Sequence, residues 1–275
     1  MEPHEQVIII GGGPAGIACA VQLKRYGLNP LLLEKDMLGG LVKNAWRIDN
    51  YPGFPDGISG YEFVERMERH VERFAIRYRI SEIRIRNYQK NKFLLTDDVR
   101  EYVSEYLIIA TGTAAKPIQL KIPEAYRDNV FTTVYPVRSV KGKSIDIVGA
   151  GDAAFDYAMT LSKHNRVTIH NRGTVIRCIP ALLDIARREP NITYLENSTV
   201  SFSTDYTIFA TGREPDLRIF SPESAQIKKQ AEHDGRLYLI GDVANGMHRQ
   251  ASVAIGDGVK AAMAVVAKII KNESN

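Results

Sequence analysis

Cysteine is scarce in this sequence, with Cys19 and Cys178 the only two among 275 residues. They stand far apart, so the chain has no disulfide framework, no Cys-x-x-Cys pair and no cluster of Cys and His at metal-ligand spacing. We therefore expect a protein of a reducing environment without a metal centre.

Long apolar runs and charge of one sign are also missing. No stretch of 18 apolar residues predicts a transmembrane helix, and the apolar run 7–10 follows acidic residues and ends at glycines, unlike a signal peptide. The 36 Lys and Arg residues exceed the 32 Asp and Glu residues by only four, without a dense basic stripe that would indicate a nucleic-acid partner. These absences favour a cytoplasmic protein with neither a nucleic-acid partner nor a membrane span.

The length favours two domains of about 150 residues each, and the first of them begins with a clear pattern. Residues 7–10 predict a buried parallel strand, residues 17–26 a helix, and residues 31–33 a second strand that stops at Glu34. The turn at 11–16 reads Gly-x-Gly-x-x-Gly, and Glu34 lies 23 positions after its first glycine. This combination is typical of a dinucleotide-binding fold.

Each glycine of this turn has a physical role. Gly11 permits the tight turn, Gly13 lets the backbone approach a pyrophosphate, and Gly16 lets the helix pack close to the strand. The helix N-terminus then directs its free N–H groups at the phosphates. Because the Glu34 carboxylate would accept hydrogen bonds from a ribose and repel a 2′-phosphate, this first site is predicted to bind FAD or NAD and not NADP.

The same pattern returns 138 residues later. Strand 144–148, the Gly-x-Gly-x-x-Ala turn 149–154, helix 155–163 and strand 167–170 repeat the first unit. Arg172 occupies the position equivalent to Glu34, and the stretch from His170 to Arg177 contributes further basic side chains. A guanidinium here suits a 2′-phosphate, so the second site favours NADPH over NADH; the alternative is that these are solvated strand-end residues.

Further short signals divide the rest of the chain. The near-duplicates 106–112 and 206–212 each predict a strand that runs into an Ala-Thr-Gly turn, at a crossing between domains. Residues 237–240 predict a strand and residues 253–270 an amphipathic core helix. The stretch 62–86 mixes arginine with glutamate, which favours a solvated helix face over a docking patch.

A series of motifs occurs in a fixed order along the chain: 11–16, Glu34, 39–41, 50–55, the two Ala-Thr-Gly turns, 241–242 and 249–251. Together they resemble the low-molecular-weight thioredoxin reductases, flavoproteins with two dinucleotide-binding domains, over nearly the whole chain. The resemblance implies an α/β fold of two Rossmann-like domains. A discontinuous FAD-binding domain would comprise residues 1–114 and 213–275, and an inserted NAD(P)H-binding domain residues 115–212.

The resemblance also implies the cofactors, FAD and NADPH with NADH left open, a homodimer, and the residues of each site. At the flavin, Asp242 would take the ribityl chain, and Gln250 and Ala251 would meet the isoalloxazine ring. The implied FAD site comprises Gly11, Gly13, Pro14, Ala15, Gly16, Glu34, Lys35, Gly40, Leu41, Asn50, Ala110, Thr111, Gly112, Gly241, Asp242, Arg249, Gln250 and Ala251. The NAD(P)H site comprises Gly149, Gly151, Asp152, Ala153, His170, Arg172 and Arg177.

The family's chemistry depends on a Cys-x-x-Cys before the second nucleotide turn. Aligning Gly142-Lys143 with the family's glycine and basic residue puts this motif at 132–135, which reads Thr-Thr-Val-Tyr, and puts Pro136 where the family has an acid. The usual thioredoxin relay is therefore excluded. Tyr135, at the lost cysteine position, is the only candidate for a catalytic residue, and it either faces the isoalloxazine or lies in a simple linker.

The remaining cysteines do not replace this pair. Cys19 lies within the first nucleotide-binding helix and is expected in the core. Cys178 follows the second unit beside the arginines, where a lowered thiol pKa and an inert thiol are both open.

The sequence thus predicts an FAD-dependent NAD(P)H oxidoreductase that passes electrons to an acceptor other than a dithiol: ferredoxin, flavodoxin, a quinone or oxygen. If the acceptor is ferredoxin or flavodoxin, the partner is a small redox protein. Related ferredoxin reductases carry a C-terminal extension with an aromatic over the flavin, and residues 271–275 contain none. The alternative function is a flavin-binding regulator or sensor with little turnover.

Overall fold

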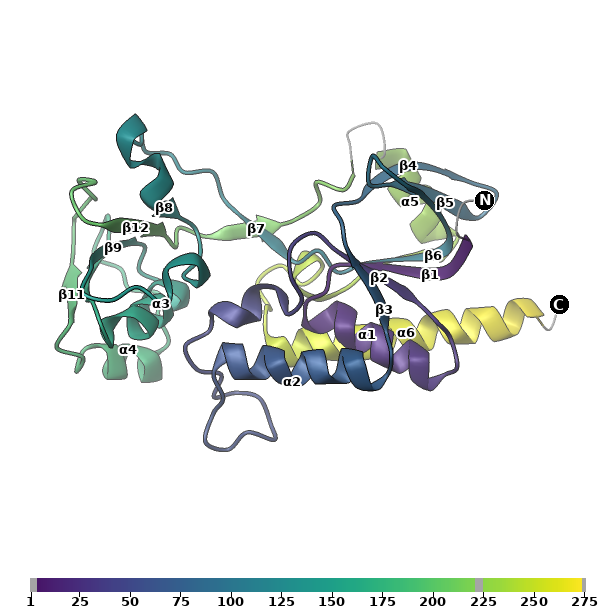
Figure 1. Ribbon diagram of the computed structural model, residues 1–275, viewed down its shortest axis with the longest axis horizontal. Helices are drawn as coiled ribbons and strands as arrows, with labels where there is room; N and C mark the ends of the chain where they lie inside the picture. Colours follow the sequence, from purple (N-terminus) through teal and green to yellow (C-terminus); the bar gives the residue numbers. More distant parts are fainter. Residues whose placement is uncertain (1–3, 221–224, 274–275) are drawn as a thin grey trace. The chain divides into compact units, whose positions relative to one another are not determined.

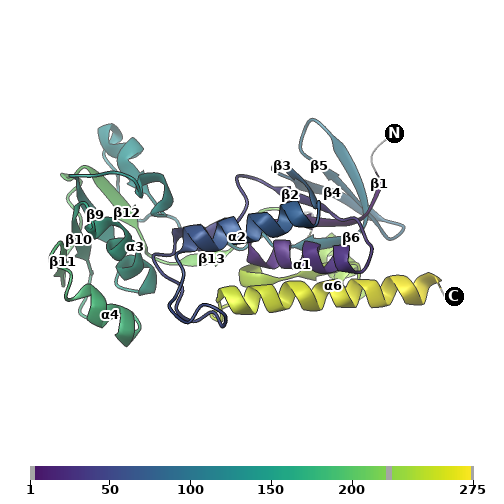
Figure 2. The same ribbon diagram turned by 60° about the horizontal axis from the view of Figure 1, so that its bottom comes forward.

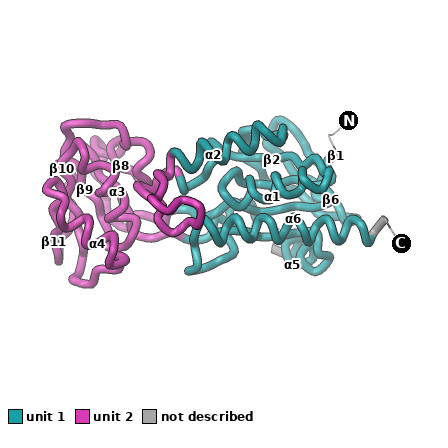
Figure 3. The backbone as a smooth tube through the Cα atoms, turned by 90° about the horizontal axis from the view of Figure 1, so that it is seen from below, with its two compact units in different colours: residues 1–42, 62–114, 214–275 teal, residues 43–61, 115–213 magenta. Residues whose placement is uncertain are grey.

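The computed structural model describes residues 4–220 and 225–273, so Ser274 and Asn275 of the C-terminal stretch considered above lie outside the described residues. The chain forms two compact units (Figure 3). Unit 1 comprises residues 1–42, 62–114 and 214–275, and unit 2 comprises residues 43–61 and 115–213.

Unit 1 is built on a seven-stranded sheet in the order β3-β2-β1-β6-β5-β4, with β14 also paired to β6. The long strand β6 pairs in parallel with β1 on one edge, while its other edge is shared by antiparallel β5 and parallel β14. The strands are β1 (His4–Ile10), β2 (Leu31–Glu34), β3 (Arg77–Ile80), β4 (Arg84–Gln89), β5 (Lys92–Thr96), β6 (Glu101–Ile109) and β14 (Leu237–Leu239).

Helices cover both faces of this sheet, which explains why its central strands are apolar without alternation. On one face α5 (Ala225–His233) contributes Ala231 to the same core cluster as Ile8 and Ile10 of β1. Three helices, α1 (Pro14–Arg25), α2 (Gly60–Arg73) and α6 (Ala251–Glu273), lie together on the other side (Figures 1 and 2). At Gly258 of α6 a side chain would collide with the Ala15 carbonyl, so glycine lets α6 pack closely on α1.

Unit 2 has a five-stranded parallel sheet in the order β11-β10-β9-β12-β8. Its elements are β8 (Val130–Phe131), β9 (Ser144–Val148), α3 (Asp152–Ser162), β10 (Arg166–His170), α4 (Pro180–Ala186), β11 (Ile192–Leu195) and β12 (Tyr206–Phe209). The core lies between the sheet and α3, where Phe155 and Leu161 pack on Ile147 and Ile169.

Two short strands, β7 (Thr113–Ala115) and β13 (Arg213–Pro215), follow the two Ala-Thr-Gly turns and pair with each other. Short 3-10 turns complete the fold: η1 (Gly40–Asn44), η2 (Glu124–Asn129), η3 (Tyr135–Val137) and η5 (Gly241–Val243). Over the part of the chain that the structure describes, no helix is long and apolar enough to cross a membrane, and no group of His, Cys, Asp or Glu side chains is arranged to hold a metal ion.

The expectation of one helix face over 62–86 is wrong beyond Arg73. Helix α2 ends there, and the arginines that follow lie on β3 and β4. Charged residues alternate with Tyr78, Ile80 and Ile85 in this stretch, and β3 is an edge strand that pairs with β2. On β4 the arginines lie on the exposed side, whereas on β3 Tyr78 and Ile80 are themselves half exposed. Such a stretch resembles a polar helix in composition, and only its strand pairing separates the two.

Residues 43–61 pack with unit 2, although the sequence analysis assigned all of 1–114 to one domain. Hydrogen bonds to unit 2 explain this. The backbone N–H of Trp46 donates to Asp156 on α3 over 2.9 Å, and the backbone N–H of Tyr135 donates to Asn44 over 3.0 Å. We call residues 43–61 the strap of unit 2.

Candidate functional site

The first glycine turn, between β1 and α1, is tightly packed at Gly11 and Gly16 and open at Gly13. Gly11 has a φ of +109°, and a side chain there would collide with the Ala110 carbonyl, as one at Gly16 would with the Gly11 carbonyl. A Cβ at Gly13 would meet nothing nearer than the Gly40 Cα, 3.9 Å away. The turn therefore leaves open the position at which a phosphate would approach the backbone.

Glu34 closes this turn from the end of β2. Its carboxylate accepts hydrogen bonds from the backbone N–H of Gly12 over 2.6 Å and of Asp36 over 3.0 Å. The side chain is buried. The same carboxylate that was predicted to meet a ribose thus also shapes the backbone of the turn.

Helix α1 begins at Pro14, and the Gly13 cap provides no side-chain hydrogen bond to the first N–H groups. An uncapped helix N-terminus beside an open glycine fits a diphosphate, which supplies the missing acceptors. The 3-10 turn η1, which carries Gly40 and Leu41, is held against the glycine turn because the Gly39 N–H donates to the Gly12 carbonyl over 2.8 Å.

The distant 241–251 segment reaches the same place. Gly241 of η5 has a φ of +71°, and a Cβ at this position would lie 2.8 Å from the Ala15 Cβ. The carboxylate of Asp257 accepts the Gly241 N–H over 3.1 Å, and Ala251 begins α6. The structure thus places Gly241 and Asp242 beside the first glycine turn. Asn50, in contrast, is exposed on the strap of unit 2.

Asp216 is a member of this region that the sequence analysis missed. Its carboxylate accepts hydrogen bonds from Arg218 and, over 2.9 Å, from Lys35, and these bonds hold the Asp216 pKa well below its usual range. Its backbone carbonyl accepts the Thr111 hydroxyl over 2.7 Å, and its N–H donates to the Gly112 carbonyl. Asp216 therefore joins Lys35 to the Ala-Thr-Gly turn; no local motif marks it in the sequence.

The second glycine turn, between β9 and α3, repeats the first. Gly149 has a φ of +142°, and a Cβ there would lie 2.5 Å from the Ala210 carbonyl oxygen, just as one at Gly11 would meet Ala110. At Gly151 the nearest atom to such a Cβ would be the Arg177 carbonyl oxygen, 4.0 Å away, and the α3 N-terminus has no side-chain cap. In both turns the first glycine packs against an Ala-Thr-Gly turn, and the backbone is open at Gly13 or its equivalent, Gly151.

The loop from 171 to 179 brings basic side chains to this second turn. The Arg177 N–H donates to the Ala150 carbonyl over 2.7 Å, and the Ile179 N–H donates to the Asp152 carboxylate over 2.8 Å. Arg172 and Arg177 are exposed, and among the described residues neither side chain has an acidic partner. Ala153, at the start of α3, is exposed as well.

His170 is a correction to the predicted phosphate-binding set. Its ring is buried, with Nδ1 2.8 Å from the Ser198 hydroxyl and Nε2 3.2 Å from the Asp146 carboxylate. Nε2 makes no hydrogen bond, but the ring is buried inside unit 2 and its Nδ1 is bonded to Ser198, so His170 is not exposed to bind a phosphate. Asn171 next to it is also buried and shapes the loop, donating to the Val175 carbonyl and the Tyr194 hydroxyl.

Neither cysteine has the environment of a redox thiol. Cys19 is fully buried in α1, as expected, and burial raises its pKa to about 12. The idea of a lowered pKa at Cys178 is wrong, because burial and the nearby Asp152 carboxylate raise that pKa to about 12. The arginines of the same loop do not offset this effect.

Tyr135 lies in η3, at the lost cysteine position. Its ring lies under two cations, 4.6 Å from the Lys43 ammonium and 4.3 Å from the Arg138 guanidinium. All three residues belong to unit 2. The ring is partly exposed.

Comparison with known proteins places this geometry in context. The model of the family "pyridine nucleotide-disulphide oxidoreductase" matches residues 5–191. The glucosaminate ammonia-lyase of Pseudomonas fluorescens is 28% identical, with 94% of each chain covered, and the thioredoxin reductase of Coxiella burnetii is 26% identical, with 94% of this chain and 95% of that one covered. The fold is similar to that of the Lactococcus lactis thioredoxin reductase, with a TM-score of 0.84 and 22% identity over 97% of this chain and 99% of that one.

Proposed function

Because the chain belongs to the pyridine nucleotide-disulphide oxidoreductase family, we propose that it carries electrons from NADPH through FAD to an acceptor that is not a dithiol. The family's members of thioredoxin reductase type use FAD and NADPH, so the predicted enzyme class and cofactors are confirmed. The acceptor is the new part of the proposal.

The observation that carries the proposal is the lack of any thiol pair. Position 132–135 reads Thr-Thr-Val-Tyr, and the two cysteines of the chain lie in different units, Cys19 in α1 and Cys178 in unit 2. Thiol–disulfide exchange requires a thiolate, and a pKa raised to about 12 leaves almost none at neutral pH. This chain therefore lacks the dithiol through which such an exchange would pass to a disulfide.

In unit 1 the open side of Gly13 and the uncapped N-terminus of α1 would hold the FAD diphosphate. The Glu34 carboxylate would accept hydrogen bonds from the ribose hydroxyls. The remaining FAD-site residues predicted from the sequence stay part of this proposal. When bound, the flavin takes hydride from the nicotinamide and passes its electrons on. The protein's own residues bind and orient the two cofactors and exclude water.

In unit 2 the open side of Gly151 and the N-terminus of α3 would hold the NADPH diphosphate. The guanidinium groups of Arg172 and Arg177, which are exposed and have no acidic partner among the described residues, would bind the 2′-phosphate. NADPH would therefore be preferred over NADH. His170 is withdrawn from this set.

Ferredoxin, flavodoxin, a quinone and oxygen are the proposed acceptors, and a homodimer in the cytoplasm is the proposed state of the protein. A flavin-binding sensor with little turnover is the alternative. A further candidate comes from the Pseudomonas fluorescens relative named glucosaminate ammonia-lyase, since the elimination of ammonia is not a thiol–disulfide exchange.

The proposal is tested with purified protein. We expect a yellow protein with a flavin absorption band, and NADPH oxidation above the oxygen background with at least one acceptor of a panel of ferredoxin, flavodoxin and quinones. Turnover with none of them favours the sensor, while ammonia release from glucosaminate favours the lyase. A colourless protein that does not take up added FAD contradicts both the oxidoreductase and the flavin sensor.

A further inference from the structure

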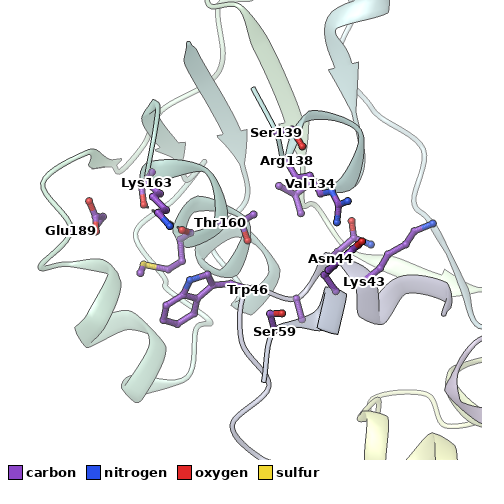
Figure 4. Close-up of a pocket in the computed structure, with 14 residues that line it drawn as sticks. Lys43, Asn44, Trp46, Ser59, Val134, Arg138, Ser139, Thr160, Lys163 and Glu189 are labelled. Carbon is purple, nitrogen blue, oxygen red and sulfur yellow. Dashed lines mark hydrogen bonds between the residues drawn. The ribbon is translucent and has the colours of Figure 1, made fainter. Parts of the chain in front are cut away.

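Unit 2 holds a pocket of about 640 Å³ that the proposed function does not use. This volume lies within the range of small-molecule sites. The strap, the C-terminal half of α3 and η3 with the residues around it form its walls, and Glu189 adds an acid (Figure 4).

This pocket is separate from the second glycine turn. The turn meets α3 at Asp152, whereas the pocket lies at Met159–Lys163, at the opposite end of the same helix. At 1.5 Å per residue the two ends are roughly 15 Å apart. None of the residues predicted to bind NADPH lines the pocket.

Arg138 gives the pocket a pre-oriented positive charge. Its guanidinium lies 4.5 Å from the centre of the Tyr61 ring and 4.3 Å from that of Tyr135, and over the described ranges no carboxylate pairs with it. Two aromatic contacts fix a guanidinium without neutralising it, so it stays available to an anion. Lys43, whose ammonium lies 4.6 Å from the Tyr135 ring centre, adds positive charge beside Arg138.

The other end of the pocket suits a flat ring. Trp46 lies at this end, away from Arg138, and Lys163 and Glu189 line the same side of the pocket (Figure 4). Its backbone is held by the Asp156 carboxylate, and Ile48 pairs with Ile58 in the same strap, so this wall is formed in advance. The Arg47 guanidinium, which does not line the pocket, covers one face of the Trp46 ring at 4.7 Å from its centre, so only the other face can stack on an aromatic base. A carboxylate such as Glu189 accepts a hydrogen bond from an exocyclic amine.

Hydroxyl groups line the pocket besides these charged and aromatic side chains. They belong to Ser59, Ser139, Thr160 and Ser162. The Thr160 and Ser162 hydroxyls donate to the Asp156 and Met159 carbonyls of α3, and Ser162 is buried. The exposed Ser139 is therefore the hydroxyl best placed both to donate to and to accept from a sugar. A flat ring, a hydroxylated middle and a phosphate are the parts of a nucleotide.

We propose that this pocket binds a nucleoside monophosphate, with its base at Trp46 and its phosphate at Arg138. The site is additional to the two dinucleotide sites. It holds whether or not the electron acceptor is a dithiol, because it rests on the geometry of unit 2 alone.

Trp46 is the only tryptophan of the chain, so its fluorescence reports directly on this pocket. The probes are 5′-AMP and adenosine, which differ only by the phosphate, added to the FAD-loaded protein in saturating NADP⁺ to fill the second glycine turn. We expect a saturable change with 5′-AMP and at least about tenfold weaker binding of adenosine, the effect of losing one charge-assisted hydrogen bond.

Arg138→Gln should weaken 5′-AMP binding about tenfold, while Arg138→Lys keeps part of it. Arg166→Gln, which removes an exposed arginine of the same unit, is the matched control. The Trp46 emission without ligand and the melting temperature verify that each variant is folded.

Three results overturn the proposal: no saturable change with 5′-AMP, equal affinities for 5′-AMP and adenosine, or equal effects of Arg138→Gln and Arg166→Gln. A 5′-AMP response that appears only when NADP⁺ is left out counts as the first of these results, because it assigns the binding to the dinucleotide turn. The flavin band and NADPH oxidation are measured in the same samples and judge the proposed function separately.

Discussion

At the scale of single residues, Glu34 and Arg172 occupy equivalent positions, but only the Glu34 side chain is bonded to its glycine turn. The Glu34 carboxylate is buried and accepts the Gly12 N–H, whereas Arg172 is exposed and a backbone group, the Arg177 N–H, holds the second turn instead. Because the side chain of Arg172 has no structural partner among the described residues, its removal should alter binding without altering the fold.

We therefore expect Arg172→Ala to slow anaerobic flavin bleaching by NADPH about tenfold and to leave the rate with NADH unchanged, since only NADPH has a 2′-phosphate to lose. Stopped-flow absorbance measures both rates. Arg166→Ala serves as the control. Equal rates with both nucleotides, unchanged in the variant, would refute the role of Arg172.

Tyr135 offers a second test at this scale. If the Tyr135 ring covers the isoalloxazine in one domain orientation, Tyr135→Ala should shift the flavin absorption band and change the rate of flavin reoxidation. Tyr135→Phe keeps the ring, so it should alter the band or the rate only as far as these depend on a hydrogen bond from the hydroxyl. Spectra and kinetics untouched by both substitutions would leave Tyr135 as part of a linker, held in place by Lys43 and Arg138.

At the scale of elements, the strap and α3 are joined by one unusual acid. Burial raises the pKa of Asp156 to about 7, against the hydrogen bonds from the Trp46 and Arg47 backbone, which lower it. Between about pH 4 and pH 7 the folded protein therefore binds more protons at Asp156 than the unfolded chain does. The free energy of unfolding should fall as the pH rises through this window.

Asp156→Asn removes this titration while keeping an acceptor for the Trp46 N–H. We expect the variant to gain about 1–4 kcal/mol over the wild type at pH 8, from about 1.4 kcal/mol per pKa unit, and to gain little at pH 4. Guanidinium denaturation at both values measures the difference. A difference that does not depend on pH would show that Asp156 does not titrate in this range.

A substitution at Gly149 tests whether the second glycine turn needs a glycine at the position equivalent to Gly11. Because its φ is +142° and a Cβ there would lie 2.5 Å from the Ala210 carbonyl oxygen, Gly149→Ala should destabilise unit 2 by about 1–3 kcal/mol and weaken NADPH binding. Gly173→Ala, in open space, is the matched control. Melting temperature and NADPH titration report the two effects; equal behaviour of both variants would contradict the steric argument.

At the scale of the whole molecule, the sequence predicts the α/β fold because the strand, glycine turn and helix pattern is local and is repeated at 11–16 and 149–154. Asp216 could not be predicted because its partner Lys35 lies 181 positions away in the sequence. The packing of the strap with unit 2 could not be predicted either, because it depends on a hydrogen bond between Trp46 and Asp156, residues that are far apart in the sequence. The burial of His170 depends on Asp146 of a neighbouring strand, and the pKa of Cys178 depends on burial and Asp152. Such contacts exist only once the chain is folded.

The claim that electrons leave this protein without a dithiol is tested most directly with the variant Cys19→Ala/Cys178→Ala, which contains no thiol. The measurement is the rate of NADPH oxidation with an acceptor of the panel that the wild type reduces, such as a quinone, compared with the wild type. The account predicts equal rates and, in both proteins, no reduction of a thioredoxin disulfide. Loss of this turnover in the variant, or reduction of thioredoxin by the wild type, would contradict it.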